Sequence, residues 1–467
     1  MSASSADRGE RSSSANVEFQ PIGHRLWSRP QVRWGAGVLA LAAGIRLLFW
    51  QVYQPAFFGD TATYLRLAKV IAGGSLRGYD GTRTPGYPAF LALIGRDPQL
   101  TWAAQMLLGL LITLGLYWVG WRLTLRPRLA AGIAAAYSLL PGLLFFEGAL
   151  LTETLTTFFI VGCLVCLTAL EQAPKEGAAI PAAGMLGVSA GLAALTRPLF
   201  FALPPILLPF IWFSSRARRM RWTRSVAFAL PPILLLGGWL AFIDSKYGML
   251  SPTVMGGYSL VQHTGAFFEY LPEEAAPIRD TYLRYRDAQI AERGSQANAI
   301  WDAIPDISRA SGLGFYDLSR EMQRLSLWLI LRHPDLYARS VADGWVAFWK
   351  APVYWDLQLL SPAWLQRALP AYALFSRVVL VLVNLLFLVL CAGGLISGRV
   401  RRALTAHYTM LAGTAMVLGI SIVQTLLDHG DNPRFLVPLQ MVVVMVVVLG
   451  LEAYLERRPA WSAPDHG

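Results

Sequence analysis

The sequence has 467 residues, of which 55% are hydrophobic and only 15% are charged, and its mean hydropathy is +0.45. Soluble chains carry about 25% charged residues, so this composition excludes a disordered chain and argues against a soluble multidomain protein. The net charge of +11 must be compared with the positive-inside rule before it is taken as a sign of nucleic-acid binding. The three cysteines lie in apolar segments, which predicts no disulfide framework. We therefore expect an all-α polytopic membrane protein.

Ten apolar segments are long enough, or nearly long enough, to cross about 30 Å of hydrocarbon. They are 34–53, 100–120, 129–147, 151–170, 180–196, 198–213, 226–245, 371–396, 406–427 and 434–452. The two segments within 180–213 are short and interrupted by proline. Residues 1–33, before the first segment, are polar and serine-rich, and we interpret them as a disordered cytosolic tail without a cleavable signal peptide.

The basic residues favour one orientation of these segments. With a cytosolic N-terminus, nineteen Lys and Arg residues fall on the cytosolic side, and the short outer turns near 148 and at 428–433 contain none. This is the positive-inside pattern, so the net charge is explained by topology and nucleic acid is not needed. We expect both termini to be cytosolic and the protein to lie in the plasma membrane (in bacteria, the inner membrane). The basic residues belong to 1–33, 121–128, 171–179, 214–225, 397–405 and 453–467.

Two long segments are expected outside, and both show amphipathic helix patterns. Residues 64–71 fit an interfacial helix, and residues 314–349 fit a second amphipathic helix. The predicted divisions are a tail (1–33), an N-terminal transmembrane module (34–245) with a catalytic loop (54–99), a large extracytoplasmic loop (246–370), C-terminal transmembrane helices (371–452) and a cytosolic tail (453–467).

The first outer loop holds the residues most suggestive of chemistry. Asp60 opens the interfacial helix, where a carboxylate is a good N-cap. The alternative is a catalytic carboxylate at the membrane surface, and the two roles are compatible. The rigid stretch from Arg83 to Pro88 contains two prolines and a glycine. Arg83 is either a solvated loop charge or a second group of the same site.

Two arginines enter apolar segments from the predicted outer side. Arg197 lies between 180–196 and 198–213, and Arg434 begins the last segment. Arginine in a membrane is costly and usually functional, and its planar fork suits phosphate oxygens. The alternative for each is snorkelling to lipid headgroups.

The remaining polar residues give weaker signals. Glu147 and Glu153 flank an outer turn, where a carboxylate would either bind sugar hydroxyls or cap a helix. His263 and His429 are most simply hydrogen-bonded loop histidines. The pair Cys163 and Cys166 has no histidine nearby and is expected to serve packing.

Several motifs taken together resemble those of the GT-C superfamily of glycosyltransferases that use polyprenyl-phosphate sugars. They are Asp-x-x-x-Tyr (Asp60 to Tyr64), Arg-x-Pro-Gly-Tyr-Pro from Arg83, and Asp-x-x-Arg-Phe-Leu-x-Pro from Asp431, with a large loop after the seventh segment. Within the superfamily, the chain is similar to the branch of protein O-mannosyltransferases and lipid A aminoarabinose transferases. It differs from the latter in having Thr61 after Asp60, where they carry an acidic pair.

The resemblance implies roles for these residues. Asp60 would be the general base for the acceptor hydroxyl, with inversion at the anomeric carbon, and Arg434 would contact the lipid-linked phosphate. The phosphate leaving group, whose second pKa is about 6, needs charge stabilisation more than protonation. The other residues expected at the substrate site are Arg197, Arg83, Tyr64, Tyr87, Glu153, His263, Asp431 and His429.

The resemblance also implies a polyprenyl-phosphate-linked sugar donor, a glycolipid, glycan or protein acceptor, and the lipid bilayer as partners. No cofactor is required. Some relatives, the oligosaccharyltransferases, use a divalent metal, and His263 or His429 with Asp60 would be its ligands, but no ligand spacing indicates such a site. The sequence has no Walker loop and no dinucleotide fingerprint, so nucleotide-driven chemistry is unsupported. The alternatives are a lipid or glycan transporter without chemistry and an O-antigen ligase or polymerase of different fold.

Overall fold

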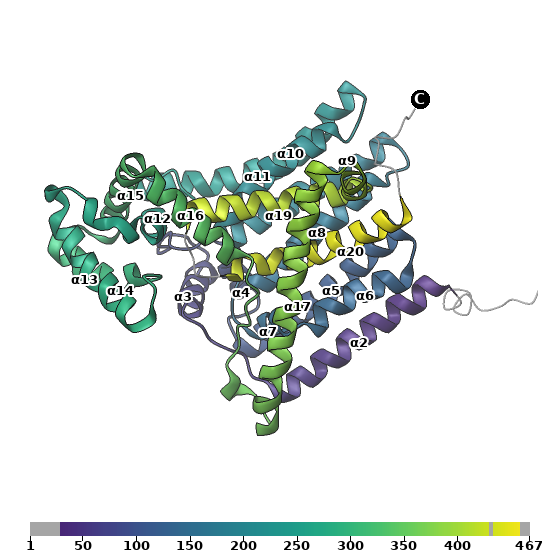
Figure 1. Ribbon diagram of the computed structural model, residues 1–467, viewed down its shortest axis with the longest axis horizontal. Coiled ribbons are helices and arrows are strands. Elements are labelled where there is room, and N and C mark those ends of the chain that lie inside the picture. Colours follow the sequence, from purple (N-terminus) through teal and green to yellow (C-terminus); the bar gives the residue numbers. More distant parts are fainter. Residues whose placement is uncertain (1–28, 429–432, 458–467) are drawn as a thin grey trace, which may run out of the picture.

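The computed structural model describes residues 29–428 and 433–457, and every regular element of this part of the chain is a helix (Figure 1). The all-α prediction is therefore confirmed. The bounds are α2 Pro30–Val52, α3 Thr61–Ala72, α4 Gly86–Leu93, α5 Pro98–Thr124, α6 Pro127–Leu139, α7 Pro141–Gly148, α8 Glu153–Glu171, α9 Ala179–Thr196, α10 Leu203–Phe213, α11 Arg218–Tyr247, α12 Gly256–Thr264, α13 Ala276–Arg293, α14 Ala299–Ser311, α15 Phe315–Arg332, α16 Pro334–Phe348, α17 Ala363–Ile396, α18 Gly398–Leu404, α19 Tyr408–Leu427 and α20 Gln440–Glu456. Two short 3₁₀ helices matter below, η2 Pro198–Ala202 and η6 Pro433–Leu439.

Eight helices of the described residues are long and apolar enough to cross a membrane, or nine if α6 and α7 form one span bent by 56°. The protein is thus a multi-pass integral membrane protein. The expected number of about ten is larger because it counted 198–213. In that segment α10 has 11 residues, roughly 16 Å of helix, which is shorter than the hydrocarbon layer. The bend between α6 and α7 falls at Pro141, which has no N–H to continue the α6 hydrogen-bond ladder.

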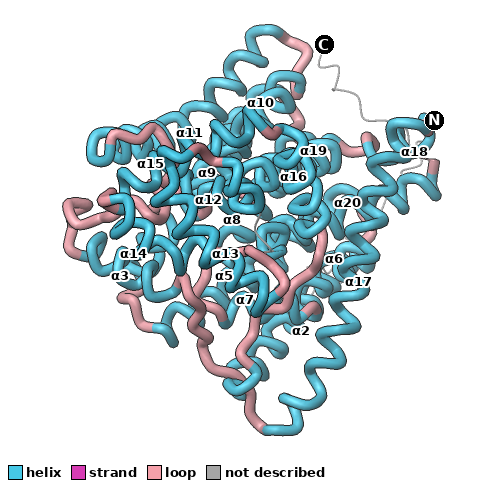
Figure 2. The backbone as a smooth tube through the Cα atoms, turned by 60° about the vertical axis from the view of Figure 1, so that its left-hand side comes forward, coloured by secondary structure: helices cyan, strands magenta, loops and turns pink. Residues whose placement is uncertain are grey.

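The helices divide into a long-helix bundle and a smaller group at one end of it. In Figure 1, α3 and α12–α15 lie together at one end, while the first residues of α2 and the last of α20 lie at the opposite end. Figure 2 shows the molecule turned so that the smaller group comes forward. Within this group, residues 258–329 form an apolar core of their own, which includes Tyr258, Phe268 and Leu325. The amphipathic stretch predicted over 314–349 is two helices, α15 and α16, because Pro334 starts a new helix after His333.

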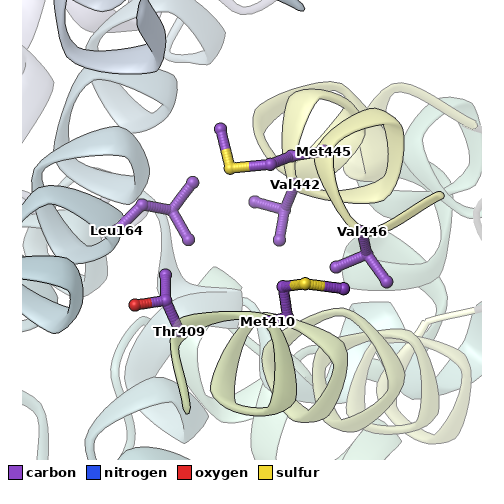
Figure 3. Close-up of a pocket in the computed structure, with 6 residues that line it drawn as sticks. All are labelled: Leu164, Thr409, Met410, Val442, Met445 and Val446. Carbon is purple, nitrogen blue, oxygen red and sulfur yellow. The ribbon is translucent and has the colours of Figure 1, made fainter. Parts of the chain in front are cut away.

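The core of the bundle lies where α8, α19 and α20 meet, and α20 is buried along almost its whole length. Figure 3 shows the apolar gap between these three helices. It is too narrow for a water molecule and has almost no polar lining, so it is a packing feature of the core. The residues that line it are Leu164, Thr409, Met410, Val442, Met445 and Val446.

A buried ion pair joins α2 to α7 inside the bundle. Arg46 donates through Nε and Nη2 to the carboxylate of Glu147, at 2.9 and 2.5 Å, and through Nη1 to Ser138 Oγ at 2.9 Å. Arg46 is 3% exposed and Glu147 is fully buried. Because an unpaired charge in an apolar interior is very unfavourable, each side chain requires the other. The expectation that Glu147 caps a helix or binds sugar at the outer turn is therefore not met, since its carboxylate is engaged by Arg46.

Gly109 of α5 makes room for this pair. A Cβ at Gly109 would lie 2.1 Å from Glu147 Oε1 and 2.5 Å from Arg46 Nη2. We therefore expect Gly109→Ala to lower the free energy of unfolding in detergent by about 1–3 kcal/mol, the usual penalty for overpacking. Gly44→Ala is the matched control, because Gly44 is exposed on α2 and its Cβ would meet nothing within 4 Å. Tryptophan-fluorescence unfolding measures both variants, and equal stability of the two would contradict this role of Gly109.

Candidate active site

The loop that carries Asp60 is fixed to the turn between α7 and α8. Ala56 N donates to Gly148 O at 2.8 Å and Leu150 N donates to Ala56 O at 3.1 Å, which forms a short parallel bridge. Thr61 Oγ1 then donates to Leu150 O at 3.1 Å. These contacts hold Asp60, at the start of α3, beside the first residues of α8.

Two arginines share the carboxylate of Asp60. Arg83 Nη2 donates to Oδ1 and Arg434 Nη2 donates to Oδ2, each at 2.7 Å. The three side chains remain 19–25% exposed, so the group is open to solutes. Asp60 occupies the N-cap position of α3, yet its side chain makes no capping hydrogen bond. Of the two roles considered for Asp60, the structure shows a carboxylate committed to arginines and not to its own helix.

A second, buried ion pair adjoins the first. Arg197 Nη1 donates to Glu153 Oε1 at 3.0 Å, and the two side chains are 6% and 1% exposed. Arg434 Nε lies 3.6 Å from the same Glu153 oxygen and so connects the two pairs. The guanidinium of Arg197 also lies over the ring of Phe435, 4.6 Å from its centroid.

We call the five linked residues the charged cluster: Asp60, Arg83, Glu153, Arg197 and Arg434. Among the described residues of this cluster, three guanidinium groups face two carboxylates, which leaves one positive charge in excess. Excess positive charge with free guanidinium N–H groups is what an anionic ligand with several oxygens requires.

The positions of the cluster residues follow from local structure. Glu153 lies in the first turn of α8, where a carboxylate is favoured by the helix dipole. Arg197 follows α9 and precedes Pro198, which stops the helix there. Gly86 lets α4 approach α9 closely, because a Cβ there would lie 2.6 Å from Leu195 O. Larger residues at Gly86 would displace the loop that carries Arg83.

The two predicted tyrosines, Tyr64 and Tyr87, pack against each other next to Arg83. The Arg83 guanidinium lies over the ring of Tyr64, 5.9 Å from its centroid, and Tyr64 packs edge-on against Tyr87. Tyr87 is fully buried and its hydroxyl donates to Gln105 Oε1 at 2.9 Å. Gln105 Nε2 donates to the carbonyls of Glu147 and Ala149, both at 2.8 Å. Tyr87 thus supports the α7–α8 turn, and Gln105, which sequence reasoning missed, joins that turn to α5.

The electrostatics keep Asp60 ionised. Burial raises the pKa of Asp60, but the charges and hydrogen bonds of Arg434 and Arg83 outweigh burial and hold the pKa well below its ordinary value. The carboxylate is therefore negative throughout the physiological pH range. The same two arginines make it a weak proton acceptor for as long as both remain bound to it.

Of the remaining predicted residues, His263 is described, and it packs against α16 and not in the cluster. His263 of α12 is buried, with Nδ1 2.9 Å from Ser340 Oγ and its ring against Tyr337, both on α16. His429 and Asp431 lie outside the described residues. Within 29–428 and 433–457, no three His, Cys, Asp or Glu side chains form a group able to hold a metal ion.

Comparison with known proteins identifies the fold. No family model matches the chain, and no curated protein sequence matches it. The archaeal oligosaccharyltransferase AglB of Archaeoglobus fulgidus, solved with an inhibitory peptide and a dolichol-phosphate, matches with a TM-score of 0.50 and 13% identity over 91% of this chain and 50% of AglB. ArnT of Cupriavidus metallidurans, bound to undecaprenyl phosphate, matches with a TM-score of 0.38 and 15% identity over 91% of this chain and 78% of ArnT.

The fold is therefore similar to that of the archaeal oligosaccharyltransferase AglB. The chain spans about half the length of the oligosaccharyltransferase it matches. At these identities the likeness concerns the fold alone. What the chain does has to be argued from the charged cluster.

Proposed function

We propose that the protein is an inverting glycosyltransferase that moves a sugar from a polyprenyl-phosphate donor to a glycolipid, glycan or protein on the extracytoplasmic face of the membrane. The observation that carries this proposal is the charged cluster, an ionised carboxylate between arginines with one positive charge in excess. It lies on a chain whose fold resembles that of enzymes that use such donors.

The proposed reaction needs a cation for the leaving group and an acceptor for one proton. The acceptor oxygen bonds to the anomeric carbon while the bond from that carbon to the phosphate oxygen breaks, and the electron pair stays on the phosphate. Arg434 stabilises the charge of the leaving phosphate. Arg197 adds a second positive charge to the same cluster. Asp60 takes the proton of the acceptor hydroxyl. Attack opposite to the leaving phosphate inverts the anomeric configuration.

A transfer assay tests the proposal directly. Purified protein is reconstituted with membrane extract, as the source of acceptors, and with a panel of radiolabelled polyprenyl-phosphate sugars. Label should move from the lipid phosphate into an acceptor fraction, and only with protein present. Movement of the labelled lipid between leaflets without any transfer would favour the transporter alternative.

The contact between Arg434 and the phosphate predicts a donor-specific defect. Loss of a charge-assisted contact weakens an interaction by about 1.5–3 kcal/mol, so Arg434→Gln should raise the donor KM or lower kcat by roughly ten- to a hundredfold. Dependence on the acceptor should change much less. Arg77→Gln is the control, since it removes the same charge from an exposed position of the loop that carries Asp60 and Arg83. Unchanged donor dependence in Arg434→Gln would place the phosphate elsewhere.

The proposed orientation predicts which residues a membrane-impermeant maleimide reaches. In a variant whose native cysteines are replaced by alanine, Glu292→Cys on α13 should be labelled in intact spheroplasts. Ala217→Cys, exposed in the basic segment 214–225, should be labelled only after lysis. The reverse pattern would overturn the orientation and move the charged cluster to the cytosolic face.

A further inference from the structure

We propose that Asp60 and the donor phosphate compete for Arg434, so that donor binding releases Asp60 to act on the acceptor and the donor binds first. This inference rests on the proposed function, because it requires a phosphate ligand at Arg434. It adds that the pairing with Arg434 keeps Asp60 from acting as a base until the donor binds.

The pairing in the structure withholds the carboxylate from an acceptor. Each oxygen of Asp60 already accepts a hydrogen bond from a guanidinium group, at 2.7 Å. An acceptor hydroxyl would have to share an oxygen with a cation, and a carboxylate bound to two cations is a poor proton acceptor. One arginine must leave before Asp60 is an effective base.

Arg434 is the partner better placed to leave. Arg83 is held on its own loop, because Nη1 donates to Thr82 O at 2.9 Å and the guanidinium lies over Tyr64. Arg434 makes one hydrogen bond to a side chain of the described residues, the bond to Asp60. Its Nε is buried and has no hydrogen-bond partner in this part of the chain.

Asp60 offers Arg434 one oxygen, because its other oxygen accepts from Arg83, whereas a phosphate can offer two. The phosphate presents several charged oxygens to the planar fork of the guanidinium, which then makes two parallel hydrogen bonds. Glu153 Oε1, 3.6 Å from Arg434 Nε, stays beside the base of the guanidinium in either arrangement and is itself fixed by Arg197. Arg434 can therefore turn from Asp60 to the phosphate without leaving the cluster.

A double-mutant cycle on undecaprenyl phosphate binding tests the competition. Binding to the purified protein in nanodiscs is measured for wild type, Asp60→Asn, Arg434→Gln and the double variant. If Asp60 competes for Arg434, Asp60→Asn should tighten binding by about tenfold, the size of one charge-assisted hydrogen bond. In the Arg434→Gln background, the same change should alter binding little.

Simple charge repulsion predicts a different pattern. If Asp60 only repels the phosphate, Asp60→Asn tightens binding equally with or without Arg434, and that result overturns the inference while the proposed function stands. Arg83→Gln is the matched background, in which tightening by Asp60→Asn should persist. Failure of wild type to bind undecaprenyl phosphate, or normal binding by Arg434→Gln, overturns both the inference and the donor site.

Carboxyl labelling tests the same exchange in the wild-type protein, so the result does not depend on whether a variant folds. Carboxyl groups are labelled with a soluble carbodiimide and glycine ethyl ester, and the modified peptides are quantified by mass spectrometry. Undecaprenyl phosphate should increase the labelling of Asp60, because Oδ2 loses its partner. Asp80, which pairs with Arg66 in the same loop, should be unaffected. Unchanged or reduced labelling of Asp60 would overturn the exchange.

Discussion

Asp60→Asn is expected to reduce sugar transfer by roughly 10²–10⁴-fold while the protein still folds and binds polyprenyl phosphate. The amide has nearly the shape of the carboxylate but cannot take a proton from the acceptor. Its NH₂ group would also face one of the two arginines that now donate to Asp60. Initial rates in proteoliposomes with a labelled polyprenyl-phosphate sugar measure the effect.

Asp97→Asn provides the matched control. Asp97 is an acid of the same loop, and its Oδ1 accepts from Leu100 N and so caps α5. Asparagine caps as well as aspartate, so this variant should transfer at the wild-type rate. Near-wild-type turnover by Asp60→Asn would remove Asp60 from the chemistry and leave the fold resemblance intact.

The second large effect is expected in stability. Glu147→Leu leaves the charge of Arg46 unpaired inside the bundle, which should lower the free energy of unfolding by about 3–5 kcal/mol. The double variant Arg46→Met, Glu147→Leu removes both charges and should recover most of that loss, because apolar side chains often replace a buried pair without penalty. Unfolding in mixed micelles, followed by tryptophan fluorescence, measures both.

An unstable double variant would give the pair a further role. Glu147 is the residue whose carbonyl accepts from Gln105, at the start of the turn that holds the Asp60 loop. If the double variant were as unstable as Glu147→Leu, the ion pair would fix the geometry of that turn as well as balance charge.

Much of the fold follows from local sequence. Each of the ten apolar segments coincides with helix, because a run of apolar residues can cross a bilayer only with its backbone groups paired within the segment. The predictions differ from the structure at prolines. The segment 198–213 was counted as a span, but α10 is short and contains Pro209. The stretch 314–349 was predicted as one helix, but α16 starts anew at Pro334. Proline positions were visible in the sequence, but whether each one bends or ends a helix depends on packing.

The site was predictable as a set of residues and not as a set of contacts. Arg197 and Arg434 were chosen because an arginine beside an apolar segment is costly without a function or a partner. Asp60 and Arg83 were chosen from the motifs of the first loop, and Glu153 from its place at a turn. Their pairing, with Asp60 and Arg434 374 positions apart, depends on how helices pack. The same reason hid Arg46, whose partner Glu147 is 101 positions away.

The central claim is that Asp60 and its arginines transfer a sugar from a polyprenyl phosphate, and mass spectrometry of the cell envelope tests it most directly. Glycolipids, glycans and proteins are compared between cells that lack the gene, cells that carry it, and cells that carry Asp60→Asn. The account predicts an acceptor heavier by one sugar unit only with the wild-type gene, and accumulated polyprenyl-phosphate sugar in the other two. Identical envelopes in all three strains, or the sugar-bearing product with Asp60→Asn, would contradict it.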